Sequence, residues 1–290
     1  MMSRSPVAIV IVVLCSLAGL AQGSSPYFVS LERWRADHES ALRADDGWLT
    51  VVGLGWLKDG ANRAGSATDA DVKLPAGAPD ALGVFRLAGG TVTFEPSAGV
   101  AAEINGQPAS QRTMRPDADR LTSGSLSLFV IERGEKFGIR MKDRNSAARR
   151  EFAGEKWYAG REAWRVTARF EPYDPPRMIP ILNVLGQVDP QPSPGAVVFT
   201  IAGKEYRLDP IGQGRQLFFI FKDLTSTDAT YPAGRFLYAP MPQNGQVVLD
   251  FNKAENPPCA VTEFATCPLP PKQNLLPIRI EAGEQYTGHK

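Results

Sequence analysis

Short segments in which apolar and polar residues alternate follow one another from Trp48 to the end of the chain, at intervals of about ten residues. Alternation with a period of two is typical of strands with one buried face. The 27 glycines and 24 prolines favour many turns over long helices. Strands at this spacing are typical of sandwiches and barrels. The sequence therefore predicts a mainly β fold built from antiparallel strands.

Several turns are marked by glycine. Asn105-Gly106 and Gly89-Gly90 each separate two alternating segments, which predicts tight hairpins. Arg133-Gly134-Glu135 and Ala202-Gly203-Lys204 predict two more. The proline-rich segment EPYDPPRMIP is expected to be an extended link, and PIRIEAGE, near the end of the chain, is expected to be the last strand.

One helix is expected before the strands. Ser25 and Pro26 are typical N-cap and first-turn residues, and the helix should end near Asp46-Gly47. The residues that repeat at helical spacing are Leu31, Trp34, His38, Ala41 and Leu42. His38 lies on this apolar face, and a packed core histidine is the expected role there. The other histidine of the chain is His289.

The first residues resemble an export signal. Arg4 precedes an apolar run from Val7 to Leu20, and small residues follow it. Removal of this segment predicts an exported mature protein, periplasmic or secreted, without a transmembrane segment; an uncleaved membrane anchor is the alternative. The predicted organisation is a signal peptide (1–23), an N-terminal helix (24–47), and two packed antiparallel β subdomains, sandwich or barrel-like (48–150 and 151–290).

Cleavage would remove Cys15 and leave Cys259 and Cys267. An even number of cysteines in an oxidising compartment favours a disulfide between them. A metal pair is a weaker alternative because neither histidine is near in the sequence. We therefore expect no metal, and the sequence gives no motif for a cofactor.

Overall composition excludes some partners. The net charge is +1, from 32 basic and 31 acidic residues, so nucleic acid is not an expected partner. The sequence has no G-x-S-x-G elbow and no phosphate-binding glycine loop. A glycosidase-like pair of carboxylates stays possible, but spacing alone identifies none.

Polar residues gather where an apolar strand ends, in LDFNKAENPPCAVTEFATCPLPPKQN. Asp250 and Asn252 are expected on one face of that strand, followed by Lys253. The prolines and the predicted disulfide would make this segment a rigid flap that holds polar groups for binding. Alternatively, it only secures the C-terminus, and Asp250 and Asn252 cap backbone groups.

Two further strand segments supply candidates. In FGIRMKD, Arg140 and Lys142 project from the face opposite the apolar residues, which predicts either an anion site or a solvated strand face. In FKDLTSTDATYPAGRFLYAP, Lys222 ends a strand and Tyr238 lies on the next one. Apolar residues of these strands, Phe218 and Ile220, could form the wall of a pocket.

The segments FFIFKDLTSTDATYPAGRFLYAP, VVLDFNKAENPPCAVTEFATCPLPPKQN and IEAGE resemble the signature of domain-of-unknown-function family 1684. GIRMKDRNSAARREF and ARFEPYDPP resemble its earlier motifs, so the resemblance extends from about Trp48 to Glu284. It implies no activity. Glu255 stands where an aromatic residue is expected in relatives, and it would alter ligand preference if it lines a pocket. The first β segment also resembles forkhead-associated domains, which bind phosphothreonine, although any small β-sandwich would share these features.

Three functions follow from this sequence. The first is a binding module for a small anionic or amphiphilic molecule, with the ligand held by Arg140, Lys222, Tyr238, Asp250 and Asn252. The second is a hydrolase in which Asp250 acts as the base with Arg140 and Asn252, and Lys253 as the acid. The third is a structural envelope protein without a pocket.

Overall fold

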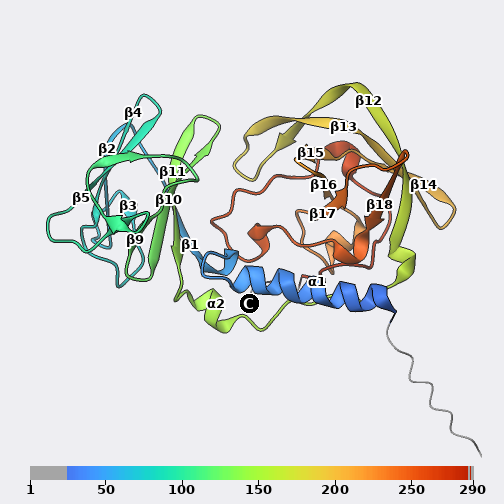
Figure 1. Cartoon of the computed structure of the whole chain (residues 1–290), viewed down its shortest axis with the longest axis horizontal. Helices are drawn as coiled ribbons and strands as arrows, with labels where there is room; N and C mark the ends of the chain where they lie inside the picture. The colour runs from blue at the N-terminus through green and yellow to red at the C-terminus, as the bar shows by residue number, and fades with distance from the viewer. Residues whose placement is uncertain (1–24, 287, 289–290) are drawn as a thin grey trace, which may run out of the picture.

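The computed structural model describes residues 25–286 and residue 288. The predicted signal peptide, Cys15 and His289 lie outside the described residues. One long helix runs beneath the group of sheets formed by the later strands and ends where the two groups of sheets meet (Figure 1). The prediction of a mainly β fold with an N-terminal helix and packed antiparallel sheets is confirmed. No helix within the described part of the chain has the length and apolar character needed to span a membrane.

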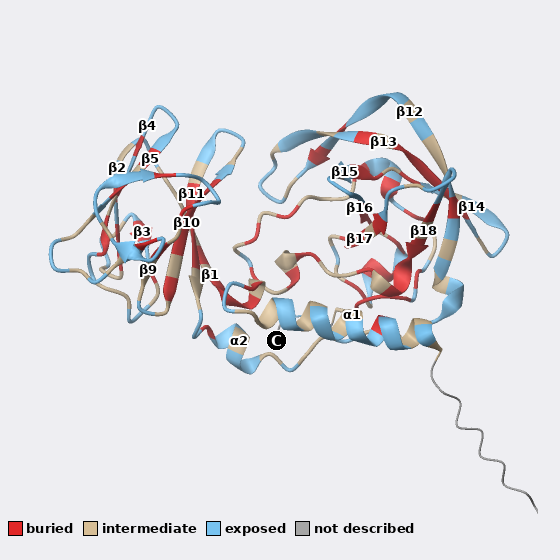
Figure 2. Cartoon of the chain, viewed as in Figure 1, coloured by how far each residue is buried: buried red, intermediate tan, exposed pale blue. Residues whose placement is uncertain are grey.

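Helix α1 (Pro26–Arg43) has the predicted start: Ser25 is its N-cap and proline follows at once. It ends a few residues before Gly47. Leu31 is fully buried, whereas the other helix residues are exposed or half-buried (Figure 2). A short 3₁₀ turn, η1 (Trp48–Thr50), leads into the first strand.

The first β unit comprises strands β1 to β11. Its sheets have the strand orders β1-β11-β10-β9-β6-β7 and β3-β2-β4-β5-β8. The strands are β1 (Val51–Trp56), β2 (Gly60–Gly65), β3 (Val72–Lys73), β4 (Gly83–Ala88), β5 (Thr91–Pro96), β6 (Glu103–Ile104), β7 (Gln107–Pro108), β8 (Arg112–Met114), β9 (Leu121–Ser123), β10 (Leu126–Arg133) and β11 (Lys136–Asp143). Asn105 and Gly106 have φ of 53° and 76° in the β6–β7 turn, as the hairpin prediction required.

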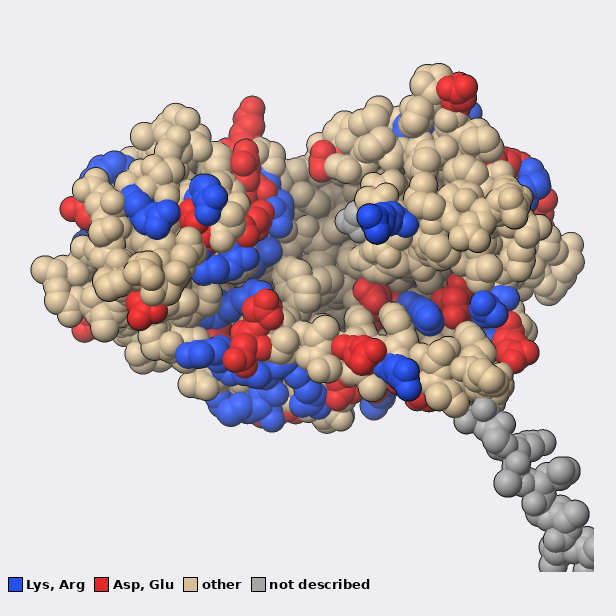
Figure 3. All heavy atoms as spheres, in the orientation of Figure 1, with Lys and Arg blue, Asp and Glu red and all other residues tan. Residues whose placement is uncertain are grey.

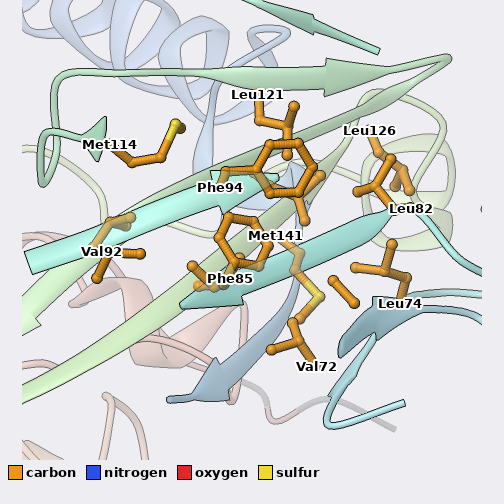
Figure 4. Packing of buried hydrophobic residues seen from close by; sticks show 14 of the residues in the cluster. Val72, Leu74, Leu82, Phe85, Val92, Phe94, Met114, Leu121, Leu126 and Met141 are labelled. Carbon is orange, nitrogen blue, oxygen red and sulfur yellow. The ribbon is translucent and has the colours of Figure 1, made fainter. Parts of the chain in front are cut away.

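The two sheets of the first unit enclose one apolar core (Figure 4). Phe85 on β4 and Phe94 on β5 pack with ring centroids 4.8 Å apart. Met141 on β11 reaches the same core from the facing sheet. This packing turns the opposite face of β11 away from the core, and that face contains Arg140.

The second β unit comprises strands β12 to β18. A short helix, α2 (Ala147–Glu151), and the 3₁₀ turn η2 (Glu162–Trp164) lead into it. Its sheets have the orders β14-β13-β12-β18 and β15-β16-β17, and β17 lies beside β18, so they curve around one core. The strands are β12 (Arg165–Leu182), β13 (Val188–Ile201), β14 (Lys204–Leu208), β15 (Ile211–Gln213), β16 (Gln216–Phe221), β17 (Arg235–Pro240) and β18 (Gln246–Asp250).

The expectation of a linker at EPYDPPRMIP is wrong, because this segment is part of β12. It pairs with β13 on both sides of a register shift between Pro172 and Arg177. β18 pairs with β12 only over Arg165–Arg169. The proline segment therefore has an open edge, where a strand tolerates residues without an N–H donor.

The chain after β18 forms short 3₁₀ turns and extended loops, not a regular sheet. The turns are η4 (Phe251–Lys253), η5 (Pro258–Ala260) and η6 (Lys272–Asn274). The prediction that PIRIEAGE forms a strand is wrong. Its backbone bonds instead to side chains of the second unit: Ile280 N–H donates to Asp223, and the Arg235 guanidinium donates to the carbonyls of Ile280 and Ala282. Asp223 also caps the 3₁₀ turn η3 (Leu224–Thr227).

Candidate functional site

A cavity of about 460 Å³ lies where helix α1 and the two β units meet. Figure 3 shows the molecular surface hollowed between the units. The first unit contributes Arg133 and Arg140, and the loop after β18 contributes most of the remaining wall. The aromatic lining residues are Trp48, Phe218, Phe236 and Tyr238. Phe218 and Tyr238 stack with centroids 4.8 Å apart and a tilt of 13°. We call this space the central cavity.

Four ionisable side chains form one wall of the central cavity: His38, Glu155, Glu255 and Glu284, here named the acid–histidine cluster. His38 Nε2 lies 3.1 Å from Glu155 Oε1, and His38 Nδ1 lies 3.3 Å from Glu255 Oε2. Both ring nitrogens therefore face carboxylates. His38, Glu155 and Glu284 each have a ligand atom within 4.8 Å of the others.

The backbone places the carboxylates of the cluster. Glu255 is paired with Phe236 on β17 by two backbone hydrogen bonds of 2.8 and 2.9 Å. Asn256 N–H donates to Glu284 Oε2 at 2.6 Å. Gly283 precedes Glu284 with φ of 79°, and an added Cβ there would lie 2.4 Å from the Ala254 carbonyl. Only glycine allows the two loops to approach this closely.

Burial and close packing shift the pKa values of His38, Glu255 and Glu284. Burial raises the pKa of Glu255 to about 7 and, together with the charge of Glu155, that of Glu284 to about 8. Burial alone would lower the pKa of His38, but its contacts with Glu155 and Glu255 outweigh burial and raise that pKa to about 9. Protons therefore offset part of the negative charge of the cluster near neutral pH.

Arg140 faces the other side of the central cavity. Its side chain is 4% exposed, and it forms no ion pair with any acid among the described residues. Its Nη2 makes two long hydrogen bonds of 3.4 Å, to the Phe264 carbonyl and Thr266 Oγ1, and its Nε has no partner there. Burial and the nearby charge of Arg133 lower its pKa. A buried guanidinium that lacks an ion pair and has an unpaired N–H favours an anion beside it.

The two cysteines of the described chain are free thiols on the same side of the cavity as Arg140, and no disulfide joins them. Cys259 N–H donates to Cys267 Sγ at 3.2 Å. A hydrogen bond from the Cys267 thiol, with a smaller contribution from the charge of Arg140, lowers the pKa of Cys259 to about 7. The same pairing raises the pKa of Cys267.

Comparison with known families matches residues 150–285 to the family described as "Protein of unknown function (DUF1684)". The match covers the second β unit with Glu155, Glu255 and Glu284, but it says nothing of the segment from Trp48 to residue 149, which the resemblance was expected to include. No curated protein matches the chain.

Solved structures also resemble the chain. An uncharacterized protein from Haloarcula marismortui, solved by NMR, is 26% identical over 48% of this chain and 79% of its own, with a TM-score of 0.40. The FhaA FHA domain, solved with the intracellular domain of Rv3910, is 18% identical over 30% of this chain and 96% of its own, with a TM-score of 0.22. An FHA domain studied for phosphothreonine-dependent interactions is 20% identical over 32% of this chain and 96% of its own, also with a TM-score of 0.22.

Among the residues predicted from sequence, Arg140 and Tyr238 line the central cavity. Asp250 and Asn252 lie instead between α1 and β18. Tyr27 on α1 donates its hydroxyl to Asp250 Oδ1 at 2.8 Å, and Asn252 Nδ2 donates to the Tyr27 hydroxyl, also at 2.8 Å. Asn252 also bonds to the backbone of Arg161. These contacts attach the helix to the sheet. Asn252 bonds to backbone groups, as the capping alternative has it, whereas the hydrogen bonds of the Asp250 carboxylate are to side chains.

The two predicted lysines also lie outside the cavity lining. The Lys253 ammonium lies 5.7 Å from the centroid of the Trp34 ring. Lys222 follows the last residue of β16 and bonds through its backbone to Asn274 and Leu276 in the C-terminal loop. The proposed function therefore rests on Arg140 and Tyr238.

Sequence reasoning missed the acid–histidine cluster. His38 was predicted to be a packed core residue, and no role was predicted for Glu155. Two sequence segments that resemble DUF1684 could have pointed to this cluster: NKAENPPC contains Glu255, and IEAGE contains Glu284. The expectation that Glu255 could line a pocket agrees with its place in the cavity wall.

Proposed function

We propose that this protein binds a small molecule with an anionic group and an apolar part in the central cavity. The observation that supports this best is Arg140, a buried guanidinium without an ion pair among the described residues. An anion beside it would replace the two long hydrogen bonds with charge-assisted ones.

The rest of the cavity suits the apolar part of such a ligand. Its volume of about 460 Å³ lies within the range of small-molecule sites. Flat apolar surfaces are offered by Trp48 and by the Phe218–Tyr238 pair. The centroid of the Trp48 ring lies 5.4 Å from Arg140 Cζ. Arg133 adds a second positive charge at the rim, where its side chain is 31% exposed. The acid–histidine cluster opposite would repel a second anionic group and so orient the ligand.

Fluorescence titration with 1-anilinonaphthalene-8-sulfonate tests the proposal, because this probe joins a sulfonate to aromatic rings. We expect saturable binding that Arg140→Gln weakens at least about tenfold, the effect of losing one charge-assisted contact. Arg86→Gln, at an exposed arginine on β4, is the matched control and should bind as the wild type does. Equal affinity of Arg140→Gln and wild type would refute the proposal.

A second readout covers ligands unlike this probe. Native mass spectrometry of the purified protein should show a copurified small molecule that is reduced in Arg140→Gln and retained in Arg86→Gln. Near-UV circular dichroism of both variants should match the wild type, which separates loss of the ligand from loss of the fold. A copurified ligand retained by Arg140→Gln would count against the assigned site.

We also propose that residues 1–23 are a cleaved export signal and that the mature protein works in the periplasm or outside the cell. There, the neighbouring thiols of Cys259 and Cys267 would oxidise to a disulfide. Intact mass of the mature protein tests both points through the cleavage site and the loss of two hydrogens. The boundary between β subdomains at residue 150 is likewise a proposal, which limited proteolysis tests.

A further inference from the structure

The geometry points to a divalent transition-metal site in the acid–histidine cluster, with His38, Glu155 and Glu284 as ligands and Glu255 as the residue that orients His38. This inference does not rest on the proposed small-molecule ligand. One imidazole and two carboxylates form a mixed nitrogen and oxygen donor set, which suits Zn²⁺ and similar ions better than Mg²⁺.

Glu155 supplies the observation that is independent of the clustering itself. Its side chain is only 3% exposed, yet neither carboxylate oxygen accepts a hydrogen bond from any described residue. Its close polar contact within residues 25–286 is His38 Nε2 at 3.1 Å, which is an ion pair while that nitrogen carries a proton. A buried carboxylate left in this state is costly unless a cation or a proton satisfies it.

The two nitrogens of His38 have different surroundings, which assigns their roles. Glu255 Oε2 lies 3.3 Å from Nδ1 and can accept the proton of that nitrogen. Release of the Nε2 proton on metal binding would free the lone pair of that nitrogen for the ion. A carboxylate that holds one nitrogen while the other binds the metal is the common arrangement around metal-bound histidine. Glu284 is oriented in a similar way by the Asn256 N–H on its Oε2.

The charge balance agrees with this assignment. None of the three carboxylates forms an ion pair with a lysine or arginine of residues 25–286. The three ligand atoms lie within 4.8 Å of one another, whereas ligands around a tetrahedral zinc ion lie about 3.4 Å apart. Side-chain movements of about 1 Å would bring the three ligand atoms to the spacing found around zinc.

An ion can reach the cluster from two sides. Glu155 and Glu284 line the central cavity and also a second cavity, which runs toward Phe152 and Tyr286. Three protein ligands next to an open cavity leave a coordination position for water or for a bound molecule. The site therefore has the ligand number of a reactive or ligand-binding metal centre, not of a closed structural one.

The test is zinc titration of the full mature protein after treatment with EDTA and dialysis. Calorimetry, with metal counting by mass spectrometry after desalting, should give one Zn²⁺ per chain and much weaker binding of Mg²⁺. We expect Glu155→Gln to lower zinc affinity by more than about 100-fold, and Glu255→Gln by about 10- to 100-fold. Glu162→Gln, at an exposed glutamate in η2, is the control and should bind as the wild type does.

Two results would overturn the assignment: wild-type protein that retains no Zn²⁺, or Glu155→Gln that binds it with wild-type affinity. X-ray absorption of the zinc-loaded wild type decides the matter even if Glu155→Gln fails to fold. Nitrogen and oxygen scatterers at about 2.0–2.2 Å are expected, whereas sulfur at about 2.3 Å would place the metal on Cys259 and Cys267 and refute the cluster.

Discussion

The buried ion pair between Asp223 and Arg235 is expected to stabilise the C-terminal loop against the second β unit, and a single substitution tests this. Arg235 Nη2 lies 3.0 Å from Asp223 Oδ1, and both side chains are 0% exposed. Asp223 Oδ2 also accepts the Ile280 N–H at 2.7 Å. The change Asp223→Asn keeps the size of the side chain but removes its charge and one acceptor.

The expected cost follows from burial. Removing one partner of a fully buried pair leaves an uncompensated charge and lowers the free energy of unfolding by about 3–5 kcal/mol. Total stability of a domain is about 5–15 kcal/mol, so the variant loses a large fraction of it. With a urea m-value of about 3 kcal/mol/M, the unfolding midpoint should fall by about 1–1.7 M.

Urea unfolding followed by circular dichroism measures this shift. Asp228→Asn is the matched control, because Asp228 pairs with Arg279 at 3.1 Å but is 58% exposed, and its midpoint should stay close to that of the wild type. Adding Arg235→Met to Asp223→Asn should restore part of the loss, because it removes the unpaired charge. A shift of less than about 0.3 M for Asp223→Asn would refute the reasoning.

Three other predictions concern the thiols, the glycine before Glu284 and the helix. In protein kept reduced, alkylation of Cys259 by iodoacetamide should be half-maximal near pH 7 and move to higher pH in Cys267→Ala, because the hydrogen bond that lowers its pKa is lost; an unchanged pH profile would contradict this origin. Gly283→Ala should lower stability by about 2 kcal/mol or more, since φ of 79° and the nearby Ala254 carbonyl disfavour a Cβ, and an unchanged thermal midpoint would exclude this strain. Tyr27→Phe should cost about 1 kcal/mol in urea unfolding because Asp250 and Asn252 lose a shared hydroxyl, and a stability equal to wild type would mean that this link does not attach the helix.

The elements of the fold were largely predictable because their causes are local. Asn105-Gly106 adopts positive φ at both residues, so its turn follows from those residues alone. The start of α1 likewise follows from Ser25 and Pro26. The two elements predicted wrongly lie where tertiary contacts replace local preference: the proline segment pairs with β13, and PIRIEAGE bonds to buried side chains.

The candidate site could be predicted only in part. Strand alternation placed Arg140 opposite the core face of β11, but it could not distinguish a solvated face from the wall of a cavity. That distinction depends on the second β unit, whose loop covers the guanidinium. Asp250 and Asn252 were predicted to lie on one face of a strand. A 3.1 Å hydrogen bond joins them, although Asn252 lies in η4 and their common partner Tyr27 is remote in sequence.

Neighbouring residues alone set the β-rich pattern, the positions of the turns, the long N-terminal helix and the segments that resemble DUF1684. Which polar residues meet depends instead on the tertiary fold. His38 comes from the helix, Glu155 from the link between the units, and Glu255 and Glu284 from the C-terminal loops. Each of these residues alone is an ordinary polar residue. Their joint burial shifts the pKa values of His38, Glu255 and Glu284 and makes their negative charge costly unless protons or a cation offset it.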